Sequence, residues 1–262
     1  MYRRTLFAAA ARRAGTFGWQ LRLHGILKDG GAAEIDRSPD ALPAGKNRLF
    51  GLRRFTEAMG MYVHVKRGLD VAIALVALVV LSPVMLMIAA AVRTTSPGPV
   101  FFRQKRVGIH RSHFMIYKFR TMRTDAPKDA PTHLLQNAAS FITPVGRFLR
   151  ASSLDELPQL FNILRGEMSF VGPRPALWNQ YDLIAAREAV GANDVLPGLT
   201  GWAQINGRDE LPIDVKARLD GEYVRRMSFA FDLRCALGTV LSVLRRDGVR
   251  EGAADAEEKR GA

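Results

Sequence analysis

Apolar positions divide the chain into one long uninterrupted run and a series of shorter, periodic ones. The long run extends from Val71 to Val92 and contains no formally charged residue. A helix needs about 20 apolar residues to cross the hydrocarbon core of a bilayer, so this run predicts a membrane-associated helix. The run follows about 60 polar and basic residues, which is not the position of an ordinary secretory signal peptide.

Ser82 and Pro83 interrupt the middle of this run. Proline removes a helical hydrogen-bond donor and clashes with the preceding turn, so a kink or a break is expected there. Basic residues flank the run on both sides, among them Lys66 and Arg93, and the positive-inside tendency draws both ends to the cytoplasmic side. A reentrant hairpin that enters and leaves by one leaflet satisfies both observations. A Pro-kinked helix that spans the bilayer once stays open as the alternative.

The region after the membrane run alternates between strand-like and helix-like patterns. Alternating apolar positions predict two strands joined by a turn within residues 96–122. Helical spacing then predicts a series of amphipathic helices, with a Gly/Pro-rich loop over residues 197–208. The expected helices cover residues 145–150, 157–164, 177–190, 212–226 and 229–246. The last of these has an apolar face that suits either the core or the bilayer surface.

These patterns predict an α+β protein. We expect a mostly helical, membrane-associated domain with a reentrant broken helix, a small β-hairpin and amphipathic interfacial helices. The expected regions are a basic N-terminal extension and linker (1–60), the membrane segment (61–95), a cytoplasmic domain (96–248) and a disordered tail (249–262).

Composition and charge narrow the class of partner. The chain has 262 residues, of which 48% are hydrophobic, so it can bury a core. Its formal net charge of +13 indicates an anionic partner, which is nucleic acid, an anionic lipid surface or a phosphorylated small molecule. No zinc-finger or RNA-recognition signature occurs, and nucleic acid does not explain the apolar run, so no nucleic-acid partner is expected. The single cysteine, Cys235, excludes an intramolecular disulfide and favours a reducing, cytoplasmic setting.

Two adjacent carboxylates, Asp155 and Glu156, precede one of the predicted helices. Ser153 and Glu156 have the spacing of a capping box, which predicts that the helix begins there. Basic residues surround the pair in sequence, and the Gly172-Pro173-Arg174-Pro175 corner is stiff enough to hold Arg174 in one place. The nearby basic residues are Lys118, Arg120, Arg147, Arg150, Arg165 and Arg174.

These residue types suit phosphate chemistry. Guanidinium groups match phosphate oxygens, and hard carboxylate oxygens can share Mg²⁺ with a diphosphate, so Asp155 or Glu156 is expected to hold Mg²⁺. A carboxylate, a hard metal, fixed arginines and a nearby membrane are what phosphoryl transfer from a soluble phosphate ester to a lipid phosphate needs.

On these residues the chain resembles the bacterial sugar transferase family, the monotopic polyprenol-phosphate phosphoglycosyl transferases. The likeness extends from Lys66 to about Arg246 in ordered blocks. They include FMIYKFRTM, VGRFLRASSLDELPQLFNILRGEMSFVGPRP and PGLTGWAQINGR.

The resemblance implies an enzyme on the cytoplasmic face of the bacterial inner membrane. Asp155 is expected to attack the sugar-bearing phosphate of a UDP-sugar and release UMP, leaving a phosphosugar-aspartate. A polyprenol phosphate, such as undecaprenyl phosphate, then accepts the phosphosugar and gives polyprenol-diphosphate-sugar, the first membrane step of polysaccharide or glycoconjugate assembly. Glu156 is expected either to help hold Mg²⁺ or to steer protons.

The same resemblance implies roles for other residues. Lys118, Arg150 and Arg174 correspond to phosphate-contacting positions, Asn206 and Arg208 to the sugar or uridine end of the site, and Ser82-Pro83 to the break in the membrane helix. Two of these have plain structural alternatives, because Arg150 would also suit a helix end and Lys118 a solvated strand face.

The functional alternative is a single-pass, membrane-anchored cytoplasmic interaction module without catalysis. It explains the apolar run and its basic flanks. It leaves unexplained why Asp155 and Glu156 lie among so many arginines.

Overall fold

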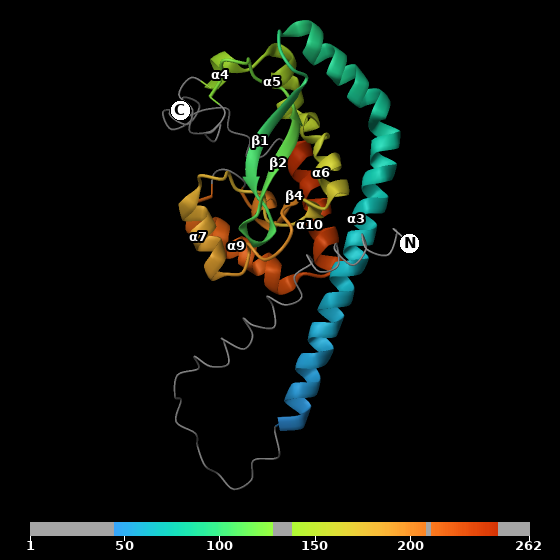
Figure 1. Ribbon diagram of the computed structural model, residues 1–262, viewed down its shortest axis with the longest axis vertical. Coiled ribbons are helices and arrows are strands. Elements are labelled where there is room, and N and C mark those ends of the chain that lie inside the picture. The colour runs from blue at the N-terminus through green and yellow to red at the C-terminus, as the bar shows by residue number, and fades with distance from the viewer. Residues whose placement is uncertain (1–44, 128–137, 208–210, 246–262) are drawn as a thin grey trace, which may run out of the picture. The chain divides into compact units, whose positions relative to one another are not determined.

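A computed structural model of the chain describes residues 45–127, 138–207 and 211–245 (Figure 1). The chain forms two compact units, residues 1–53 and 54–262. The first unit is described only from Gly45, where helix α3 begins. Most of the expected N-terminal extension and all of the expected tail therefore lie outside the described residues.

Helix α3 (Gly45–Thr95) contains the long apolar run. Between Gly60 and Thr95 it is long and apolar enough to cross a membrane, judged by length and composition. The break expected at Ser82 and Pro83 is not observed, because both residues lie inside a continuous helix that bends in its C-terminal part (Figure 1). The Ser82 hydroxyl donates a hydrogen bond to the carbonyl oxygen of Val79 (2.8 Å). This is the carbonyl that Pro83 leaves without its usual donor, so the serine compensates for the proline.

The predicted strand-turn-strand segment is confirmed. Strands β1 (Phe101–Val107) and β2 (His113–Phe119) pair antiparallel, in a register from Phe101 opposite Phe119 to Val107 opposite His113. A short 3-10 turn, η1 (Ile109–Arg111), connects them. Phe114 and Ile116 are buried on one face of β2, because side chains two residues apart in a strand point the same way.

Five predicted helices are also confirmed, with shifted boundaries. A further short helix, α4 (Ala138–Phe141), precedes them. The five are α5 (Pro144–Ala151), α6 (Gln159–Arg165), α7 (Tyr181–Ala189), α9 (Ile213–Arg226) and α10 (Phe229–Arg245). Helix α7 begins later than expected because Leu177 forms a β-bridge with Arg106 at the end of the hairpin.

The prediction of a loop over residues 197–208 is wrong in its first part. Strand β4 (Gly198–Thr200) pairs in parallel with β3 (Ser169–Val171), and the short helix α8 (Trp202–Ile205) follows. Gly198 permits this pairing, because a Cβ atom at this position would lie 2.1 Å from the backbone nitrogen of Gly172.

Replacing Gly198 with alanine should therefore destabilise the domain. The added methyl group would meet backbone rather than a flexible side chain, and overpacking of this kind costs about 1–3 kcal/mol. The matched control is Gly68→Ala in α3, where a Cβ would have no neighbour within 4 Å and alanine favours the helix. Thermal unfolding in detergent should show a lower midpoint for Gly198→Ala alone; equal midpoints would contradict the close approach of β3 and β4.

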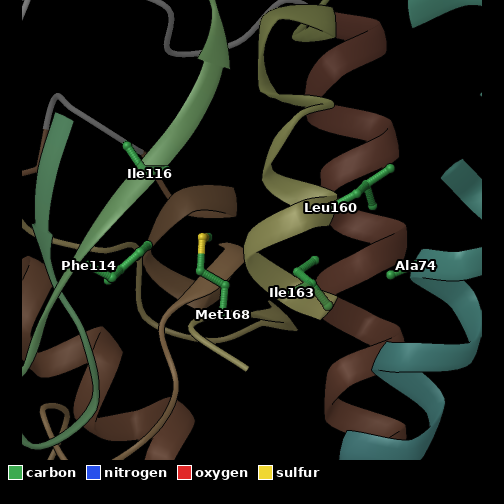
Figure 2. Packing of buried hydrophobic residues seen from close by; sticks show 6 residues of the cluster. All are labelled: Ala74, Phe114, Ile116, Leu160, Ile163 and Met168. Atoms are coloured by element: carbon green, nitrogen blue, oxygen red, sulfur yellow. The ribbon is translucent and has the colours of Figure 1, made fainter. Parts of the chain in front are cut away.

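The main hydrophobic cluster joins α3 to the hairpin and to α6. Figure 2 shows its six buried residues, with Ala74 coming from α3 and Leu160 and Ile163 from α6. A second cluster packs Met85, Ile88 and Val92 of α3 against Phe119 and Leu149. Both halves of the apolar run therefore contact the same domain.

Polar contacts fasten the N-terminal end of the apolar run. Lys66 Nζ lies 2.7 Å from a carboxylate oxygen of Asp232 in α10. Arg67 donates to the carbonyl oxygens of Ile163 (2.6 Å) and Leu164 at the end of α6, where cationic side chains are favourable. Asp70 accepts a hydrogen bond from the Phe170 backbone in β3.

Helix α10 has one buried face and one exposed face. Phe231 and Cys235 are buried in a cluster with Tyr223 of α9 and Val171 of β3. The opposite face carries exposed apolar residues, which are Leu233, Leu237, Val240 and Leu241. The apolar face that the sequence predicts is thus the exposed one.

Candidate active site

The two adjacent carboxylates lie in a tight turn between α5 and α6. Asp155 and Glu156 belong to a 3-10 turn, η3 (Leu154–Glu156), and α6 begins only after Pro158. The capping-box prediction is wrong, because Ser153 has a left-handed backbone (φ 57°) and its side chain caps nothing, whereas an N-cap residue normally has an extended one. A left-handed non-glycine residue costs free energy and often marks a functional site.

Glu156 is held by two cations. Lys118 Nζ and Arg174 Nη2 each lie 2.7 Å from its Oε1 atom. Burial alone would raise the pKa of Glu156, but the charges and hydrogen bonds of Arg174 and Lys118 outweigh this effect and hold it well below its usual range. Glu156 is therefore a fixed carboxylate that keeps both cations in place.

Asp155 has a different environment although it is the next residue. Its Oδ2 atom is 3.8 Å from Lys118 Nζ, beyond hydrogen-bonding distance, and the residue is only 8% exposed. Burial raises the pKa of Asp155, opposed by the charges of Lys118, Arg150 and Arg174. A desolvated carboxylate near cations that do not neutralise it by direct contact suits a nucleophile.

The cations reach this point from three separate elements. Lys118 comes from β2, Arg150 from the last turn of α5 and Arg174 from the corner after β3. The Lys118 side chain is only 16% exposed, which excludes the solvated-face interpretation. Arg150 lies in the last turn of α5, as the helix-end alternative has it, and its positive charge also acts to lower the pKa of Asp155.

Other basic residues near the pair in sequence have other surroundings. Arg120 is buried and donates to the carbonyl oxygens of Pro97 and Ser96, just after α3. Arg165 donates to the hydroxyl of Tyr117 (2.7 Å), and Arg147 is exposed. The structure thus separates the cations near the carboxylates from those with structural or surface positions.

The predicted sugar or uridine end comprises Asn206 and Arg208. Asn206 follows α8, where its side chain donates to the carbonyl oxygen of Trp202 (2.7 Å). Within the part of the chain that the structure describes, no hydrogen bond joins Asn206 to Asp155 or Glu156. Arg208 lies outside the described residues.

The carboxylates fit Mg²⁺ only if the substrate shares it. The described ranges contain no group of three or more side chains suited to hold a metal ion. Mg²⁺ is commonly bound by one or two carboxylates together with water and substrate phosphates. Glu156 Oε1 already accepts two hydrogen bonds, so Asp155 offers the less occupied oxygens.

Sequence reasoning missed a buried ion pair beside the site. Arg187 Nη2 of α7 lies 2.7 Å from Asp220 Oδ2 of α9, and the two side chains are 5% and 1% exposed. The available signal was helical spacing, because Arg187 falls on the same face of α7 as the buried Leu183. A charged residue at a core-facing position indicates a buried partner.

Comparison with known proteins gives one consistent answer. The sequence profile of the family described as "Bacterial sugar transferase" matches residues 61–246. The chain is 42% identical over 186 residues to the uncharacterized sugar transferase EpsL of Bacillus subtilis, a match that covers 71% of this chain and 90% of the relative.

Two similar relatives have a named activity. UDP-glucose:undecaprenyl-phosphate glucose-1-phosphate transferase of Xanthomonas campestris is 42% identical over 70% of this chain. The enzyme of the same name from Escherichia coli is 41% identical over 71% of this chain. The matches span 39% and 41% of these two relatives, so the likeness covers less than half of each.

Proposed function

The chain belongs to the bacterial sugar transferase family, and from this premise we propose that it transfers a sugar 1-phosphate from a UDP-sugar to a polyprenol phosphate through a phosphosugar-aspartate on Asp155. Two relatives named as undecaprenyl-phosphate glucose-1-phosphate transferases support the donor and acceptor classes. The observation that carries the proposal is the buried Asp155, which lies 3.8 Å from Lys118 and next to Glu156, the residue that holds both Lys118 and Arg174 at 2.7 Å.

In the first step, an oxygen of the Asp155 carboxylate attacks the sugar-bearing phosphorus. The bond from that phosphorus to the oxygen bridging the two phosphates breaks, and UMP leaves with the bond's electron pair. Lys118, Arg150 and Arg174 stabilise the negative charge on the phosphoryl oxygens during this transfer. Mg²⁺ would be held by Asp155 together with the substrate diphosphate and water, and would supply further charge neutralisation for the diphosphate.

In the second step, a phosphate oxygen of the polyprenol phosphate attacks the same phosphorus. The phosphorus–oxygen bond to Asp155 breaks, the carboxylate is regenerated, and polyprenol-diphosphate-sugar is formed. A covalent intermediate divides one difficult exchange into two easier ones and predicts ping-pong kinetics. Glu156 stays ionised throughout, because Arg174 and Lys118 keep it so.

Both ends of the apolar run belong on one side of the membrane in this proposal. Lys66 and Arg67, at its start, contact α10 and α6, and Val92, near its end, packs against the hairpin cluster. A straight helix from Lys66 to Val92 would be about 39 Å long at 1.5 Å per residue, longer than the hydrocarbon core of about 30 Å. One domain cannot contact both ends of a helix that crosses the bilayer, so we place α3 in the cytoplasmic leaflet.

Exposed apolar surface on α3 and α10 supports membrane attachment. Val79 of α3 is 75% exposed and Leu233 of α10 is 60% exposed. Amphipathic helices insert such faces into the boundary between head groups and acyl chains. The active site would then open near the lipid phosphate of the acceptor, on the cytoplasmic face of the inner membrane.

Cysteine labelling tests this topology. Val65→Cys and Thr94→Cys, made singly, should both react with a membrane-impermeant maleimide from the cytoplasmic side only, because both positions are exposed and flank the apolar run. The native Cys235 should give no background, since burial, followed by the charge of Asp232, raises the pKa of its thiol to about 11. Labelling of the two variants from opposite sides would show that α3 crosses the bilayer.

The function itself is tested with purified protein, UDP-glucose and undecaprenyl phosphate in detergent. We expect UMP and a lipid-linked diphosphate sugar to form, and EDTA to abolish product formation, with Mg²⁺ restoring it. Other UDP-sugars, including galactose and N-acetylated sugars, then define the donor. If no UDP-sugar yields UMP although the purified protein is folded, the non-catalytic interaction module is the better interpretation.

A further inference from the structure

Other segments donate hydrogen bonds to four of the five carbonyl groups in the corner that carries Arg174. Residues 172–176 have no regular secondary structure, and two of them are prolines, which lack a backbone donor. Yet four consecutive carbonyl oxygens, those of residues 173–176, each accept a hydrogen bond from another segment. The donors are Gly198 N (2.9 Å), Arg187 Nη1 (2.8 Å), Arg106 Nη1 (3.0 Å) and Val107 N (2.9 Å) in that order.

Arg187, which donates to the Arg174 carbonyl, is itself held in place by Asp220. Arg187 donates from Nε to Asp220 Oδ2 (2.8 Å), and its Nη2 lies 2.7 Å from the same oxygen. Its remaining terminal nitrogen, Nη1, reaches the Arg174 carbonyl oxygen. One planar guanidinium thus joins α7, α9 and the corner. A lysine ammonium lacks this rigid fork and would not hold both partners in the same fixed geometry.

This ion pair is a poor choice if stability is its only purpose. Removing two charges from water is costly, and apolar pairs of similar volume often give equal or greater stability. The pair instead fixes the backbone of Arg174, while the side chain of Arg174 extends to Glu156 (2.7 Å). The residue that binds phosphate in the proposed function has its main chain held by the buried Arg187 and its side chain by the partly buried Glu156.

We propose that Arg187, oriented by Asp220, is a positioning residue that sets where the Arg174 guanidinium meets the donor phosphate. This inference rests on the proposed function for the role of Arg174. Its contribution passes through Arg174 alone, so it vanishes when Arg174 no longer carries a guanidinium. A purely structural ion pair would affect the enzyme whether or not Arg174 is present.

A double-mutant cycle separates these possibilities. The rate of UMP release is measured for the unaltered protein, Arg187→Lys, Arg174→Gln and the double variant. We expect Arg187→Lys to lower the rate about tenfold in the unaltered background and less than about twofold in the Arg174→Gln background. Equal losses in both backgrounds would overturn the proposal. Arg226→Lys, which alters the exposed pair with Glu222, is the matched control and should keep the rate.

A second variant tests the proposal if Arg187→Lys does not fold. Arg187→Met combined with Asp220→Leu replaces the ion pair by apolar side chains, which such sites tolerate, and it also removes the donor to the Arg174 carbonyl. We expect a thermal midpoint close to that of the unaltered protein, with the same loss of rate and the same dependence on Arg174. A folded double variant with full activity would overturn the proposal.

Hydrogen exchange gives a readout that does not depend on activity. Amides of residues 171–177 should exchange faster in Arg187→Lys than in the unaltered protein or in Arg226→Lys, because the corner loses one of its four supports. Unchanged exchange would contradict the inference. If the unaltered protein releases no UMP, the proposed function fails, and exchange still decides whether Arg187 holds the corner.

Discussion

Replacing Asp155 with asparagine is expected to abolish measurable UMP release, with a loss of about 10³-fold or more, the scale seen when a catalytic nucleophile is removed. The amide has nearly the same shape but is a poor nucleophile toward phosphorus. The measurement is single-turnover formation of UMP from UDP-glucose without lipid acceptor. Rapid UMP release by Asp155→Asn would show that another residue or water attacks the donor.

The same substitution should leave the fold intact or stabilise it. Burial raises the pKa of Asp155, which means that the folded state disfavours its charged form, so a neutral isostere avoids this cost. The thermal midpoint of Asp155→Asn should therefore equal or exceed that of the unaltered protein. Asp125→Asn, at an exposed aspartate paired with Arg123, is the control and should keep full activity.

Replacing Arg174 with glutamine should have the second-largest effect. Removing one preorganised donor from a phosphoryl-transfer site costs about 10²-fold to 10³-fold in rate. The loss should occur in the UMP-forming step, because Arg174 forms an ion pair with Glu156, the residue next to the attacking Asp155. Glu156 keeps its hydrogen bond from Lys118 (2.7 Å), so this partly buried carboxylate is not left unpaired and the protein should remain folded.

The matched control for Arg174→Gln is Arg147→Gln. Arg147 is also close to the carboxylates in sequence, but it is exposed on α5. Substitutions at such surface positions change the free energy of unfolding by about 0.5 kcal/mol or less. Its rate should stay within about twofold of the unaltered protein. If both substitutions lower UMP release equally, general positive charge, rather than the fixed contact of Arg174, accounts for phosphate binding.

Elements with a strong period could be predicted from the sequence. The hairpin alternates apolar positions around a turn, and α9 and α10 keep an apolar stripe, so their existence followed from local pattern. The β3–β4 pairing could not be read, because two three-residue strands far apart in sequence carry almost no periodic signal. Pro83 predicted a kink or a break. The helix does not break, because the Ser82 hydroxyl donates to the carbonyl that the proline leaves free, and such local compensation is not visible in a hydropathy pattern.

The carboxylate pair and its cations were found because unusual residue types cluster along the chain. Their geometry was not predictable, because the left-handed Ser153 replaces the expected cap and turns the pair toward β2. Which basic residues gather there depends on contacts between segments, so Lys118 and Arg174 reach Glu156 while Arg165 bonds to Tyr117. The pairing of Arg187 with Asp220 could not be predicted for the same reason, because it joins two separate helices.

The most direct test of the account is peptide mass spectrometry of the protein after brief incubation with a UDP-sugar and Mg²⁺ in the absence of lipid. Covalent transfer through Asp155 predicts an acid-labile phosphosugar adduct on this residue that disappears when polyprenol phosphate is added. Release of UMP without any adduct on Asp155, or an adduct on a different residue, would contradict it.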